Sequence, residues 1–122
     1  MTRKETDRAI QAYIEAALWT STDEEGETFE SLNFDAQDIE GKSIANMAAD
    51  VEDFVSANEE KLDESGLEPE QIGQDFWLTR NRHGAGFWDR GLGKVGRELS
   101  DAAHVYGSSD LYIGDDEKLH TT

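Results

Sequence analysis

The sequence predicts a small α+β domain, and three observations support that prediction. Apolar residues recur at helical spacing in three separate stretches of the chain. Stretches rich in aromatic and branched residues, at 75–80, 86–89 and 110–113, are typical of strands. The 122 residues suffice for one hydrophobic core and are too few for two. We therefore expect a single domain over residues 1–122 with the order α-α-β-β-α-β and a three-stranded sheet, which helices cover on one face.

The acidic N-terminal part, about residues 1–70, is expected to be helical. A first amphipathic helix is predicted over about 4–19, and a polar loop follows at 20–30. A second helix is predicted to begin at Ser43 as N-cap and to end at Gly66. The apolar faces of these helices are formed by Ile10, Tyr13, Ile14, Ala17 and Leu18, and by Ile44, Met47, Ala48, Val51, Phe54, Val55 and Leu62.

The C-terminal part, about residues 73–114, is expected to contain the sheet. Its two aromatic stretches are joined by a turn at 81–85 and predict a β-hairpin. A third helix is predicted from the apolar stripe at 92–106, and the last strand follows at 110–113. The polar tail at 115–122 is expected to be frayed.

The negative charge of the chain is concentrated in its middle. There are 28 acids and 11 bases, a formal net charge of -17, and residues 23–70 hold 17 of the acids with two bases. Such a charge repels phosphate, which excludes nucleic acid and anionic membranes as direct ligands. No apolar run is long enough to span a membrane and residues 1–20 lack a signal peptide, so we expect a soluble, cytoplasmic protein. The absence of cysteine excludes disulfides and thiolate metal sites.

The acids of the second helix are spaced like a row of phosphates. Three to four residues of helix advance about 4.5–6 Å, close to the step between successive phosphates of a nucleic-acid strand. We therefore predict a non-enzymatic nucleic-acid mimic, which occupies the basic groove of a nucleic-acid-binding host protein. Two alternatives are a solvated helix face and adaptation to a high-salt cytoplasm. The partner-binding residues of this hypothesis are Asp50, Asp53, Glu60 and Glu64 on the helix, and Asp23, Glu24, Glu25 and Glu27 in the loop before it.

Two further patterns suggest small-molecule chemistry. Residues 91–96 (GLGKVG) match the dinucleotide fingerprint after a predicted strand, with acids at 115–116, but no second nucleotide-binding half follows. Glycines there are explained by a tight turn from strand to helix, so we expect no cofactor. His83 with Asp89 and the neighbouring arginines gives an alternative ligand-binding or hydrolytic site. The three histidines lack the spacing of metal ligands, and we expect no metal.

The segment DFWLTRNRHGAGFWDRGLG at 75–93 is unusually rich in aromatic residues and arginine. Its exposed side chains are candidate anchors for a protein partner, since Trp and Arg are common at interfaces. Together with LYIGDD near the end, this segment resembles small uncharacterised proteins encoded by phages and other mobile elements, over about residues 70–116. In size and acidity the chain is similar in kind to DNA-mimic anti-restriction and anti-CRISPR proteins. The resemblance implies a phage or mobile-element origin and a host-cell location, and the charge hypothesis makes a host defence nuclease the most natural target. The candidate anchors are Trp77, Arg82, His83 and Trp88.

Overall fold

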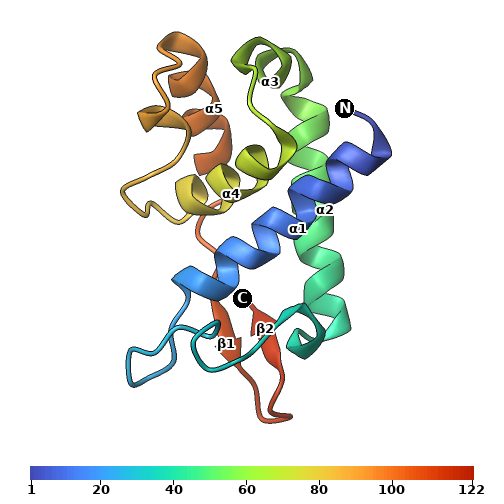
Figure 1. Ribbon diagram of the computed structural model, residues 1–122, viewed down its shortest axis with the longest axis vertical. Helices are drawn as coiled ribbons and strands as arrows, with labels where there is room; N and C mark the ends of the chain where they lie inside the picture. Colours follow the sequence, from blue (N-terminus) through green and yellow to red (C-terminus); the bar gives the residue numbers. More distant parts are fainter.

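Most of the chain is helical, and its sheet is a single hairpin near the C-terminus (Figure 1). The computed structural model describes all residues, 1–122. Two short 3₁₀-helices, η1 and η2, lie between the α-helices. The elements are α1 (Arg3–Thr20), η1 (Ala36–Asp38), α2 (Gly41–Ala57), α3 (Glu59–Ser65), α4 (Pro69–Arg80), η2 (Phe87–Asp89), α5 (Lys94–His104), β1 (Leu111–Ile113) and β2 (Leu119–Thr121).

The first predicted helix is confirmed as α1, and it crosses α4 at very short range (Figure 1). A capping box fixes its start, because the Thr2 hydroxyl accepts from the Glu5 amide while the Glu5 carboxylate accepts from the Thr2 amide. Where the helices cross, Gly73 lies directly against the backbone of Ala9, and a Cβ atom at Gly73 would clash with the Ala9 carbonyl oxygen. The close packing of α1 on α4 therefore requires glycine at position 73.

An aromatic cluster fills the core between α1, α2 and α4. The rings of Phe54 and Phe76 are stacked with centroids 4.2 Å apart, and Phe87 stacks on Phe54 at 5.6 Å. Tyr13 packs edge-on against Trp77 with centroids 5.2 Å apart. These five side chains are almost completely buried, so the aromatic residues at 76–87 belong mainly to the core.

The predicted three-stranded sheet is wrong. Residues 75–80 form the second half of α4, which begins with Pro69 in its first turn, and residues 86–89 fall in η2 and its cap. Every side chain from 75 to 80 is buried, so this half of the helix has no polar face to reveal its period. A short apolar run of this kind has the same pattern in a buried strand and in a buried helix.

The C-terminal tail is ordered by the hairpin. Strands β1 and β2 pair antiparallel with Tyr112 opposite His120, and Leu119 is completely buried. The Glu40 amide donates to the Leu119 carbonyl at 2.8 Å, and the Thr121 amide donates to the Ser43 hydroxyl at 3.0 Å. The expectation of a frayed tail is therefore wrong for residues 119–121, because a fully apolar side chain anchors them.

The second predicted helix is divided in two. Glu40, instead of Ser43, caps α2 by accepting from the amides of Lys42 and Ser43. At Asn58 the chain leaves α2 and starts α3, and the Asn58 side chain donates to the Phe54 carbonyl at 2.9 Å. Gly66 ends α3 with φ of 68°, as predicted. None of the helices is both long and apolar enough to cross a membrane.

Candidate functional site

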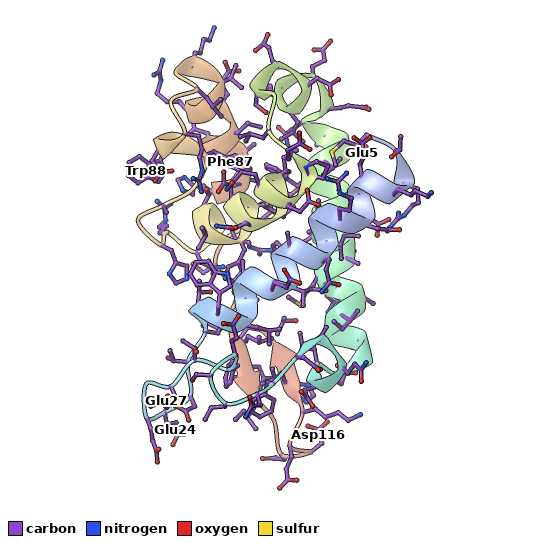
Figure 2. All side chains as sticks on the ribbon, viewed as in Figure 1. Glu5, Glu24, Glu27, Phe87, Trp88 and Asp116 are labelled. Atoms are coloured by element: carbon purple, nitrogen blue, oxygen red, sulfur yellow. The ribbon has the colours of Figure 1, made fainter.

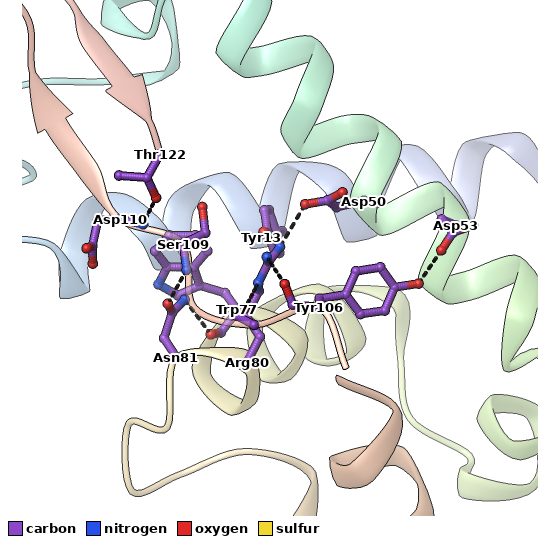
Figure 3. Close-up of polar contacts among 11 residues, drawn as sticks. Tyr13, Asp50, Asp53, Trp77, Arg80, Asn81, Tyr106, Ser109, Asp110 and Thr122 are labelled. Atoms are coloured by element: carbon purple, nitrogen blue, oxygen red, sulfur yellow. Dashed lines mark hydrogen bonds and ion pairs between the residues drawn. The ribbon is translucent and has the colours of Figure 1, made fainter. Parts of the chain in front are cut away.

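Asp50, the first acid of the predicted phosphate-like row, is an internal ion-pair partner (Figure 3). Arg80 is only 6% exposed, and its guanidinium donates to the Asp50 carboxylate at 2.7 Å and to the Tyr13 hydroxyl at 2.9 Å. The same guanidinium donates to the carbonyls of Tyr106 at 3.0 Å and Gly107 at 2.8 Å. A buried cation needs such partners, so Asp50 joins α2 to α4 and to the segment after α5.

Asp53 has a similar role one turn further along α2. Its carboxylate accepts from the Tyr106 hydroxyl, as Figure 3 shows. Burial, together with this contact, raises the pKa of Tyr106 above its ordinary value, and burial raises the pKa of Tyr13 to about 12. Both tyrosines therefore stay neutral across the physiological range.

The remaining predicted carboxylates lie at two different ends of the molecule. Glu60 and Glu64 are exposed on α3 and form no ion pair. Figure 1 places α3 at one end of the long axis and the loop at 21–34 at the other. Glu24 and Glu27 extend from that loop at the lower end (Figure 2). The structure thus separates the helix acids from the loop acids, which the sequence-based hypothesis combined in one surface.

Two distant segments of the chain meet at this lower end and form what we call the acidic end, defined as residues 23–40 and 114–118. Together they carry eleven acids and one base, a charge of -10 out of -17. Figure 2 shows Glu24, Glu27 and Asp116 at this same end. A parallel bridge between Ile39 and Leu119 holds the two segments together.

His120 adds a second link across the acidic end. Its ring nitrogens lie 2.9 Å from the Asp116 carboxylate and 3.8 Å from that of Glu40. The hydrogen bond with His120 lowers the pKa of Asp116, and backbone amides at the start of α2, first that of Lys42, lower the pKa of Glu40. These contacts keep both carboxylates ionised and fix the hairpin against the start of α2.

A groove of about 520 Å³ opens between the loop of the acidic end and strand β1. Its apolar lining, which we call the floor, consists of the buried Phe29 ring with Tyr112 and Ile113 of β1, and we call its acidic lining the rim. Tyr112 is 46% exposed and Ile113 is 44% exposed. The rim is formed by the loop acids Asp23, Glu24 and Glu25.

The loop that carries the rim has a defined shape. The Asp23 carboxylate accepts from the amides of Glu25 and Glu27, both at 2.9 Å, and the flanking Thr22 and Thr28 form an antiparallel bridge. Asp23 therefore shapes the loop, while Glu24 and Glu25 extend into solvent without an ion-pair partner. Sequence reasoning found these acids but missed the groove. The sequence carries no clear signal for it, because alternation along β1 places Ile113 on the same side as the buried Leu111, whereas Ile113 is half-exposed.

The aromatic segment supplies some of its predicted anchors. Trp77 is buried and its indole nitrogen donates to the Thr20 hydroxyl at 2.7 Å, so it is a core residue and no surface anchor. Trp88 is 57% exposed, and Arg82 and His83 are exposed as well. These three side chains lie outside the lining of the groove.

The two acids of the aromatic segment nearest to His83 in sequence, Asp75 and the hydrolytic candidate Asp89, accept hydrogen bonds from other groups. Asp75 is fully buried and accepts two hydrogen bonds from Arg90, at 2.8 and 3.0 Å, and one from Gln71 at 2.8 Å. Asp89 accepts from the Gly86 amide at 3.1 Å. No hydrogen bond or ion pair joins the His83 ring to either acid, and His83 lines a separate polar hollow with Asp110. The segment therefore does not bring the predicted acid and base together.

The glycine motif at 91–96 lacks the strand that a dinucleotide fingerprint requires, because η2 precedes it. Gly96 lets α5 approach η2, since a Cβ atom there would lie 2.8 Å from the Phe87 carbonyl oxygen. The motif thus serves close packing in this structure. No group of three or more His, Asp or Glu side chains is arranged to hold a metal ion.

Comparison with known proteins adds no family assignment. No protein-family model, curated protein or solved structure matches the chain. The functional proposal therefore rests on the site's own chemistry: dense negative charge beside an open groove with apolar lining.

Proposed function

We propose that this chain is a non-enzymatic binding protein, a nucleic-acid mimic that occupies the cationic surface of a host DNA- or RNA-handling protein. The observation that supports the proposal best is the acidic end, where two segments far apart in sequence combine eleven acids with a single base. Like charges held together repel, so a folded protein that gathers them there gives up stability. A cationic partner offsets that cost on binding.

The loop carboxylates suit this role because they are displayed on an ordered backbone. Glu24, Glu25 and Glu27 are exposed and form no ion pair within the chain. The hydrogen bonds to Asp23 and the bridge between Thr22 and Thr28 hold the loop in one conformation. Fixed anionic groups meet a partner with less loss of conformational freedom than flexible ones do.

The other acids have different parts in the proposal. Glu60 and Glu64, at the opposite end, attract a cationic partner at long range without sharing the contact surface. Asp50 and Asp53 stabilise the fold through Arg80 and Tyr106, and we do not count them among the main contacts with the partner.

The class of target follows from the charge of the chain, which suits a basic nucleic-acid-binding groove. The resemblance of residues 70–116 to proteins of phages and mobile elements supplies the context of a host cell. A host defence nuclease, which must bind DNA or RNA through a basic groove, is the partner that an acidic decoy blocks. Neither nucleic acid nor an anionic membrane is a direct ligand of so acidic a chain.

The test is displacement of a labelled DNA duplex from purified basic DNA-binding proteins, including restriction and RNA-guided nucleases. We expect the wild-type chain to displace the duplex, and the effect to fall steeply between about 50 and 200 mM salt. The variant E24Q/E25Q/E27Q should act about tenfold more weakly, because three exposed ion pairs contribute about 0.5 kcal/mol each. The matched control D63N/E60Q/E64Q, which removes the same charge from α3, should lose about threefold or less.

Each contrary result has a defined meaning. Displacement of none of the proteins, or displacement indifferent to salt, refutes the mimic. Equal losses in the two triple variants show that net charge alone acts, without a contact surface. Abolition of the effect by H83A and by D89A alike favours the hydrolytic alternative, since the mimic predicts little loss from either residue. Unfolding at low salt with recovery in molar salt favours adaptation to high salt.

A further inference from the structure

We propose that the groove in the acidic end receives an apolar side chain from a cationic segment of the partner. This inference rests on the proposed function and deepens it. The segment of the partner that binds is then a run of arginine or lysine with one aromatic or large aliphatic residue in it. The apolar side chain enters the groove, and the cationic side chains pair with the acids of the rim.

The floor of the groove is the first reason. Tyr112 and Ile113 are neighbours in β1, and they are the only two large apolar side chains adjacent in sequence that are both substantially exposed. Both line the same groove, beside the buried Phe29 ring. An apolar surface in a concave site is typical of a place where a partner side chain is buried.

The floor is also firmly held. The Tyr112 ring stacks on the His120 ring with centroids 5.7 Å apart, and His120 is held in turn by Asp116 and Glu40. Phe29 packs edge-on against Phe34 with centroids 5.7 Å apart. A site whose walls are fixed before binding loses little conformational freedom on binding.

Charge complementarity identifies the occupant. The rim contains three acids, Asp23, Glu24 and Glu25, and no basic residue lines the groove. An anionic or purely apolar ligand would meet unfavourable desolvation of these carboxylates, whereas arginine or lysine flanking an apolar side chain pairs with them. The combination of an apolar centre and a charged rim is the usual anatomy of a protein-binding hot spot.

Two arginine-rich peptides of equal length test the inference, differing only in a central tryptophan or serine. We expect the wild-type chain to bind the tryptophan peptide about tenfold more tightly by fluorescence anisotropy. The variant Y112S/I113S should bind both peptides equally and keep the affinity for the serine peptide within about twofold. The variant E24Q/E25Q should bind both more weakly and keep the ratio between them.

The control V105S removes an exposed apolar side chain outside the groove and should leave the tenfold preference unchanged. Equal affinity of the wild-type chain for the two peptides overturns the groove inference and leaves the proposed function standing. An equal loss of preference in V105S overturns it as well. Failure to bind either peptide at low salt refutes both the groove and the proposed recognition of cationic partners.

Discussion

Replacing Asp50 with asparagine separates its structural role from a role in binding. The substitution keeps the shape of the side chain and removes the charge that balances Arg80, whose guanidinium is 6% exposed. Removing one member of a fully buried ion pair costs about 3–5 kcal/mol, and an exposed pair contributes about 1 kcal/mol or less. The Asp50 side chain is 42% exposed, so we expect a loss of about 2 kcal/mol.

Thermal unfolding followed by circular dichroism measures this loss. With an unfolding entropy of about 2.1 cal/mol/K per residue, a chain of 122 residues loses about 8 °C in Tm for 2 kcal/mol. E60Q removes the same charge from an exposed position without an ion pair, and its Tm should change by about 1–2 °C at most. Equal Tm values for D50N and E60Q would refute the reasoning that Asp50 is a structural counter-ion.

Two further predictions concern the core. Gly73→Ala should lower the free energy of unfolding by about 3 kcal/mol, because the added Cβ atom forces α1 and α4 apart at Ala9. The control Gly41→Ala adds its Cβ atom in open space at the start of α2 and should change this free energy by at most about 0.5 kcal/mol. Urea unfolding measures both. Raising the pH from 10 to 12 should also weaken the fold, because the unfolded chain releases the Tyr13 proton near pH 10 while the folded chain keeps it until about pH 12. The loss of stability between pH 10 and 12 is about 2 kcal/mol, since the limit of 1.36 kcal/mol per pKa unit is reached only above the folded-state pKa. Tyr13→Phe should reduce the difference in urea midpoint between these pH values. An unchanged difference in urea midpoint between pH 10 and pH 12 in Tyr13→Phe would contradict the assignment of this loss of stability to Tyr13.

The helices that the sequence predicts best are those with one polar and one apolar face. α1 shows the 3.6-residue period clearly because Gln11 and Glu15 alternate with buried residues. The second half of α4 has no such signal, since core contacts surround it and even Asp75 and Arg80 are buried. Its charged residues find partners only through the tertiary fold, and a local pattern does not encode those partners.

Only part of the candidate site was predicted, because local sequence patterns show the acids of the loop but not the distant residues that lie beside them. The acids of the loop at 23–30 are visible in the composition, and so is their excess over bases. Their association with Asp115, Asp116 and Glu117 depends on pairing between Ile39 and Leu119, a contact across 80 residues of chain. Hydrophobic periodicity describes neighbours within one element, so it gives no information about such a contact. The half-exposed Tyr112 and Ile113 become a groove only beside the loop at 22–29.

The link between Glu40 and Leu119 has a consequence for the order in which the acidic end is assembled. Ribosomes deliver a chain from its N-terminus, so α1 and most of the core are available before the strand that completes the acidic end emerges. The loop at 21–34 is therefore made before Tyr112 and Ile113 of β1, the two residues that complete the groove beside it.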